Sequence, residues 1–191
     1  MGKYIYLLAI MQALFSLKGN AQQNIISIVP VSEFRFQSFS LGLSYERVFD
    51  KTGKIGIKIP FYKGLNTNGG GGFSLLMYKY KFQTSPSIYF YPFGQRKITW
   101  GTGFSYFFFQ TRYNYISDVS SEPNLDIRMR TQGINFSNVV RANVGNRFCV
   151  AIEVGLGKTI SEQSKYLNIG GGHKGENYQT AHYNMSFGFK F

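Results

Sequence analysis

The sequence predicts an all-β fold, in which eight antiparallel strands run up and down and close into a transmembrane barrel. Three observations lead to this prediction. Apolar and polar residues alternate along most of the chain, short and long connections alternate between these segments, and the mean hydropathy is only −0.15 although 18% of the residues are aromatic. Alternation with a period of two is typical of a strand with one apolar face. A mean hydropathy this low excludes a bundle of membrane helices. Alternating strands fit the value, because the polar half of each strand keeps the mean hydropathy near zero.

Eight segments carry the alternation. They are residues 24–31, 37–49, 55–62, 73–92, 98–112, 131–143, 148–160 and 181–191. The fourth is about twice as long as the roughly ten residues that cross a bilayer. It contains Thr84-Ser85-Pro86, and a proline removes one hydrogen bond from the ladder. We expect a single strand that bulges there; the alternative is two strands, which would raise the count to nine.

The connections predict how the strands are oriented. Those at 50–54, 93–97 and 143–147 are short, whereas those at 64–72, 113–130 and 161–176 are long. Transmembrane barrels have tight turns at one end and longer loops at the other. Both termini then lie at the end with the short turns, which requires an even number of strands, and eight is even.

The first short turn also predicts a register. Phe49 and Ile55 both belong to apolar faces, which fits a turn of five residues between them. The same register sets Glu46 opposite Lys58 on the inner faces of neighbouring strands. We expect a cross-strand ion pair between these two side chains.

The last eleven residues form the clearest strand of the chain. Their odd positions are apolar or aromatic and their even positions are small or polar, and the chain ends on Phe191. This pattern resembles the C-terminal strand of the small eight-stranded outer-membrane β-barrel proteins of Gram-negative bacteria. The resemblance implies an outer-membrane location with periplasmic termini. It also implies that the barrel-assembly machinery reads the closing strand, through Tyr183, Phe187, Phe189 and Phe191.

The first 21 residues predict a cleaved signal peptide. Lys3 precedes an almost wholly apolar stretch from Tyr4 to Leu17, and Gly19-Asn20-Ala21 supplies a small-x-small cleavage site. We expect the barrel to form one domain of residues 22–191.

The formal charge is +12, and loss of the two signal-peptide lysines leaves +10. On an exported barrel this charge suits outer-membrane lipids and the phosphates of lipopolysaccharide rather than nucleic acid. A polar lumen with interface lysines and no specific ligand explains the charge equally well.

The interior of an eight-stranded barrel is filled by side chains or holds one small ligand, so a wide porin channel is excluded. Buried charges must be paired, which favours a polar network that neutralises itself over a small binding cavity or an ion path. The residues predicted for this lumen network are Glu46, Lys58, Lys79, Lys81, Arg141, Glu153 and His182.

Sequence motifs for catalysis are scarce. There is no P-loop and no HExxH motif, and we predict no catalytic residue, cofactor or metal site. His182 and Ser186 lie roughly 13 Å apart along one strand, which is too far for a base and its nucleophile. We therefore expect a non-enzymatic barrel that presents loops outward and serves envelope integrity, adhesion or a larger envelope protein complex. The alternative is a lipid A-modifying enzyme or a barrel that binds a small ligand.

Overall fold

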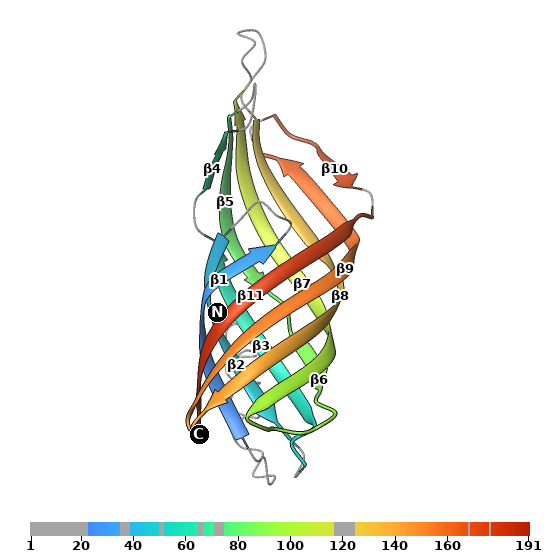
Figure 1. The fold of residues 1–191 in the computed structure, drawn as a ribbon. Coiled ribbons are helices and arrows are strands. Elements are labelled where there is room, and N and C mark those ends of the chain that lie inside the picture. The colour runs from blue at the N-terminus through green and yellow to red at the C-terminus, as the bar shows by residue number, and fades with distance from the viewer. Residues whose placement is uncertain are drawn as a thin grey trace, which may run out of the picture.

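The computed structural model describes residues 23–34, 39–49, 52–64, 67–70, 75–116, 125–167, 169–175 and 177–191, and all of the regular elements there are β-strands (Figure 1). In this part of the chain no helix is long and apolar enough to span a membrane. The segment 1–21 lies outside the described residues, so its cleavage as a signal peptide stays a prediction.

Eight strands form the wall of a closed antiparallel barrel, which confirms the predicted fold class. In order around the wall they are β1 (Gln23–Phe34), β2 (Phe39–Val48), β3 (Ile55–Gly64), β5 (Leu75–Thr84) continued by β6 (Ser87–Phe90), β7 (Ile98–Ile116), β8 (Leu125–Val144), β9 (Phe148–Tyr166) and β11 (Gln179–Lys190). Two further strands, β4 (Thr67–Gly70) and β10 (Gly172–Gly175), pair with β5 and β9.

The barrel closes between the first and last strands. β1 and β11 are antiparallel neighbours, with Ile26 opposite Phe189. At their ends the backbone of Asn24 and that of Phe191 exchange two hydrogen bonds of 3.0 Å. Closure leaves no free edge in the eight-stranded wall, which is the condition for a β-sheet to exist in a hydrocarbon environment.

The long fourth segment follows one course along the wall, as expected, but the bulge lies elsewhere. The strands on either side of Pro86 pair with β3 and with β7 in one continuous register. The proline carbonyl accepts a hydrogen bond of 3.0 Å from the backbone of Tyr106, so only the donor side of the ladder is lost. The register shift lies between Tyr80 and Phe82.

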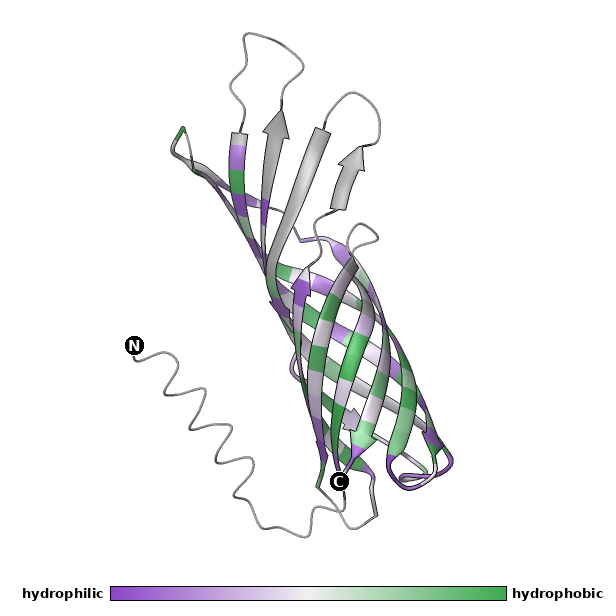
Figure 2. Cartoon of the chain, turned by 90° about the vertical axis from the view of Figure 1, so that its left-hand side faces the viewer, coloured by the Kyte–Doolittle hydropathy of each residue, from purple (hydrophilic) through white to green (hydrophobic). Residues whose placement is uncertain are grey.

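The predicted long loops are largely strands, which corrects the sequence analysis. The expected loop 113–130 is mostly the upper parts of β7 and β8, and the expected loop 161–176 contains the end of β9 and all of β10. Each strand keeps its antiparallel partner there, so the backbone ladder continues. Figure 2 shows hydrophilic residues, in purple, along the coloured strands that extend above the barrel. On β8 and β9 polar residues alternate there with more buried ones, as at Arg128, Arg130, Gln163 and Lys165, so the apolar alternation that marks a strand disappears. We call the upper parts of β7, β8 and β9 together with β10 the extension.

Below the extension, large apolar side chains are exposed on the outer face of the wall. Along β8 they run from Val144 to Ile134. The ten steps from Ile134 to Val144 span about 33 Å along the strand at about 3.3 Å per residue, or about 25 Å of height at a tilt of about 40°. This height matches the apolar band of transmembrane barrels. Members of the band on other strands are Ile28, Leu43, Ile88, Ile98, Phe104, Leu156 and Phe187.

On the inner face, glycines make room for large aromatic rings. A side chain at any of four inward glycines would collide with a ring that packs over it, and each of the four rings is almost fully buried. The pairs are Gly42 with Tyr62, Gly101 with Tyr91, Gly103 with Tyr89, and Gly133 with Phe107. The interior of the wall is therefore filled by side chains of complementary size.

We predict that Gly103→Val destabilises the barrel by about 1–3 kcal/mol, because the added methyl groups meet the ring of Tyr89 and the backbone of Ile88. Ala142→Val is the matched control, since Ala142 lies on β8 and is exposed on the outer face. Urea unfolding in detergent micelles measures both effects. Equal midpoints for the two variants would contradict the packed interior.

Candidate functional site

The buried polar side chains of the lumen form the candidate site. Two clusters of them contain ion pairs. The first, at the end with the short turns, consists of Glu46, Tyr91, Gln95 and Arg141, and we call it the short-turn cluster. The second, the central cluster, consists of Lys58, Glu153, His182 and Asn184.

In the short-turn cluster the carboxylate of Glu46 is held by two donors. The Tyr91 hydroxyl donates a hydrogen bond of 2.6 Å to one oxygen, and Arg141 forms an ion pair with the other. The second terminal nitrogen of Arg141 donates to Gln95 Oε1 at 3.2 Å, and the guanidinium lies over the Tyr91 ring. A buried arginine and a buried glutamate thus neutralise each other.

In the central cluster the carboxylate of Glu153 is the shared acceptor. Lys58 Nζ donates to Oε2 at 2.6 Å, while His182 Nε2 lies 3.0 Å from Oε1. Asn184 donates to Oε1 at 3.4 Å and accepts a hydrogen bond of 2.5 Å from the Ser32 hydroxyl. These contacts connect β3, β9, β11 and β1 through one carboxylate.

Both ion pairs cross the lumen. β2 with Glu46 and β8 with Arg141 are four strands apart in either direction around the wall, and the same holds for β3 with Lys58 and β9 with Glu153. Each pair therefore connects opposite sides of the barrel. The side chains in both pairs are between 4 and 8% exposed, so neither charge is neutralised by water.

The predicted register is confirmed, because Glu46 lies opposite Lys58 on the neighbouring strand. The prediction that these two side chains form an ion pair with each other is wrong. The two residues are cross-strand neighbours, but each reaches across the lumen to a partner on the opposite wall. The physical reason is the small diameter of an eight-stranded barrel, which puts opposite inner faces within the reach of long side chains.

Two residues of the predicted network, Lys79 and Lys81, lie on β5 above the other five. Their side chains lie outside the described residues. The register shift between Tyr80 and Phe82 interrupts the strict alternation on which their inward orientation was predicted.

His182 has a serine neighbour that the sequence could not identify. Ser137 on β8 and His182 on β11 both lie opposite Gly155 of β9, which has no side chain to separate them. Ser137 Oγ lies 3.4 Å from His182 Nε2. The same nitrogen contacts Glu153, whereas in a catalytic triad the serine and the carboxylate use different ring nitrogens. Ser137 is also completely buried, so a substrate has no access to its hydroxyl.

The residues that sequence reasoning missed are Tyr91, Gln95, Asn184 and Ser137. Asn184 and Ser137 occupy inward positions of strands that the alternation had identified. Tyr91 continues the buried positions of Ser87 and Tyr89 in the predicted segment 73–92, so the alternation could have identified it. Gln95 belongs to a short turn, where no periodicity indicates the direction of a side chain.

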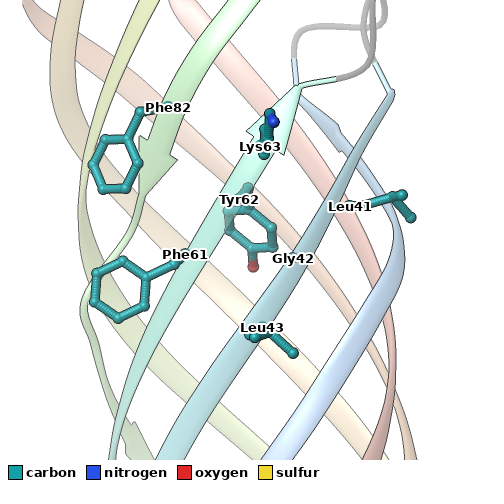
Figure 3. Close-up of a pocket in the computed structure, with 7 residues that line it drawn as sticks. All are labelled: Leu41, Gly42, Leu43, Phe61, Tyr62, Lys63 and Phe82. Carbon is teal, nitrogen blue, oxygen red and sulfur yellow. The ribbon is translucent and has the colours of Figure 1, made fainter.

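A groove on the outer wall is a second candidate (Figure 3). It has a volume of about 460 Å³ and separates Leu41 and Leu43 from Phe61 and Phe82, with Lys63 at its upper end. Its walls belong mainly to the apolar outer face, and Tyr62 and Lys63 are its lining residues with titratable groups. The lining contains no carboxylate or histidine that could pair with Lys63 in acid–base chemistry. We therefore assign this groove to the apolar outer wall.

The closing strand places the four predicted assembly residues on the outer face. Tyr183, Phe187, Phe189 and Phe191 are all exposed, and the ring of Phe189 packs edge-on against Phe148 of β9 at 5.6 Å. Their role in assembly stays a prediction.

We predict strong energetic coupling across the lumen. Glu153→Gln alone leaves the buried Lys58 ammonium without its ion-pair partner and should lower the free energy of unfolding by about 3–5 kcal/mol. A double-mutant cycle of Lys58→Met with Glu153→Gln, measured by unfolding in micelles, should give a coupling of about 0.5–3 kcal/mol. The control cycle combines Lys58→Met with Glu46→Gln, its register neighbour. A larger coupling in the control cycle would contradict the cross-lumen pairing.

No protein-family model matches the chain, and its sequence matches no curated protein. Solved structures do match. A major outer membrane protein of Thermus thermophilus aligns with a TM-score of 0.56 at 8% identity, over 88% of this chain and 99% of that chain. The N-terminal β-barrel domain of Pseudomonas aeruginosa OprF aligns with a TM-score of 0.53 at 10% identity, over 90% and 98%. Ail, the attachment invasion locus protein of Yersinia pestis, aligns with a TM-score of 0.54 at 13% identity, over 88% and 98%. At sequence identities this low, the similarity shows a common fold and nothing more. The chain has the eight-stranded fold of outer-membrane β-barrel proteins.

Proposed function

We propose that the chain is a non-enzymatic integral outer-membrane β-barrel, which keeps its lumen closed and presents the extension to the outside of the cell. The observation that carries this proposal is the outer face of the closed wall. Exposed apolar side chains surround the wall over a height of about 25 Å, as a bilayer requires. If this apolar surface were exposed to water, it would promote aggregation of the protein.

The interior supports a closed lumen. Almost fully buried rings fill it at several levels, and the two ion pairs bridge it. Conduction of solutes needs a much wider barrel, in which the inner face borders water. We therefore assign the inner residues to stability rather than to transport.

The extension supports a role at the cell surface. Its strands continue beyond the apolar band, and the described outward side chains of β8 and β9 there are mainly polar, which suits a β-sheet that projects into water. A rigid platform of this kind suits adhesion, envelope integrity or the docking of another subunit of an envelope complex. With the extension outside, the short turns and Phe191 lie in the periplasm. There the barrel-assembly machinery can read Tyr183, Phe187, Phe189 and Phe191.

The alternative function, a lipid A-modifying enzyme, has less support. Ser137 and Glu153 compete for one nitrogen of His182, and all three side chains are buried in the lumen. Such an enzyme would need its reacting groups exposed near the outer leaflet. A binder of a small ligand is likewise disfavoured, because rings and charged side chains occupy the lumen.

The test uses one epitope inserted at two positions, in Gram-negative cells that produce the protein. We expect antibody to label intact cells when the epitope lies between Ser120 and Ser121, at the connection of β7 and β8. An epitope at Asn146, in a short turn, should be labelled only after the outer membrane is permeabilised. Labelling of the Asn146 epitope on intact cells would reverse the orientation, and labelling of neither would refute surface exposure.

A further inference from the structure

The extension carries a group of cations on its outward face. Arg128 and Arg130 of β8 alternate with Ile127 and Thr131, which are buried on the inner side. On β9, Lys165 lies directly opposite Arg128. We call Arg128, Arg130 and Lys165 the basic patch. They line one groove of about 560 Å³, and β10, which lies beside β9 (Figure 1), completes it.

In the described part of the chain, no carboxylate is a cross-strand partner of the basic patch. Like charges directly opposite each other on antiparallel strands are destabilising, and Arg128 faces Lys165 in this way. The neighbouring Arg112 of β7 is different, because it forms an ion pair with Asp126.

Among the described residues, the three cations of the patch form no ion pair, and the groove has no acidic lining residue. The Nε atom of Arg128 is buried and has no hydrogen-bond partner there. Glu162 is bonded to Thr131 and Tyr178, and Thr131 lies on the inner face. Within the described residues, the patch therefore has the charge and the hydrogen-bond donors of an anion site.

The height of the basic patch indicates where the anion comes from. Beside the patch the apolar band reaches Ile160 of β9, which lies between the partners of Gln132 and Gly133 of β8. Arg130 and Arg128 follow two and four residues beyond Gln132, which places them about 5 and 10 Å above the edge of the band at the usual rise and tilt. The headgroup layer of a bilayer is about 5–7 Å thick on each side. Arg130 lies at the level of this layer, and the long side chain of Arg128 can reach it.

We propose that the basic patch binds a phosphate group on a lipid headgroup of the outer leaflet, in the manner of a phosphorylated glycolipid such as lipid A. The fork of a guanidinium matches two phosphate oxygens, and Lys165 adds a point charge opposite it. Gln163 and Ser164, which also line the groove, supply neutral hydrogen-bond donors. The acyl chains of the same lipid then lie along the apolar band below. This inference rests on the membrane placement proposed above.

The test is an equilibrium titration of the detergent-solubilised, folded barrel, followed by native mass spectrometry. The probes are lipid A with both phosphates, lipid A without phosphates, and inorganic phosphate. We expect the wild type to bind bisphosphorylated lipid A at least tenfold more tightly than the dephosphorylated form. The variant Arg128→Gln/Arg130→Gln/Lys165→Gln should lose at least tenfold in affinity.

The matched control is Arg96→Gln/Lys97→Gln/Arg147→Gln, which removes the same three charges from exposed positions at the end with the short turns. Its affinity should stay within twofold of the wild type. Equal losses in the two variants, or equal binding of the two forms of lipid A, would overturn the site. Binding of inorganic phosphate as tight as that of lipid A would overturn the assignment to a lipid headgroup.

Heat-modified mobility on gels verifies that each variant is folded. If the triple variant does not fold, the exposed Arg130→Gln alone should lower the affinity at least threefold, and an unchanged affinity would overturn the site. Because the titration uses solubilised protein, a folded barrel without phosphate-dependent binding refutes the basic patch and leaves the membrane placement standing. The epitope experiment tests that placement alone.

Discussion

Backbone hydrogen bonding in hydrocarbon is the constraint on which the rest of the structure depends. An unpaired N–H or C=O group costs several kcal/mol where no water can reach it, so a membrane sheet must close on itself. Here the closing contact is the pair of backbone hydrogen bonds between Asn24 and Phe191. Closure with eight strands gives the barrel a small diameter. The narrow lumen then limits the size and charge of the side chains on the inner face.

The inner face meets this condition with two devices. Glycines lie beneath the largest rings, so that the wall and its contents interlock, as Gly103 and Tyr89 show. Charges are paired across the diameter, which makes each ion pair a bridge between opposite walls. A buried charge without its partner is strongly destabilising. The same residues that make the lumen polar therefore also hold it closed.

The sequence predicts most of the wall because the outer face must be apolar throughout the membrane. That requirement produces the period of two, from which the strand count follows. Together with the five residues of the first short turn, it also determines the register of Glu46 with Lys58. It does not predict ion-pair partners, because the side chains that meet across a lumen belong to strands far apart in sequence. Lys58 and Glu153 are 95 residues apart, as are Glu46 and Arg141.

Above the apolar band the predictive signal fades for a different reason. The positions of β8 and β9 that face outward in the extension are mainly polar, so they show no apolar alternation and their sequence resembles that of a loop. For the same reason the basic patch is visible only after β8 and β9 are placed side by side. The bulge between Tyr80 and Phe82 is another local feature that alternation alone does not locate.

The central claim is that the lumen is closed by its own side chains. The most direct measurement is the swelling of liposomes that contain the refolded protein, in an isotonic solution of a small sugar such as arabinose. A filled lumen predicts swelling no faster than that of protein-free liposomes, while a porin in the same lipid swells readily. Swelling at the rate of the porin would contradict the closed interior and, with it, the assignment of the two cross-lumen ion pairs to stability rather than transport.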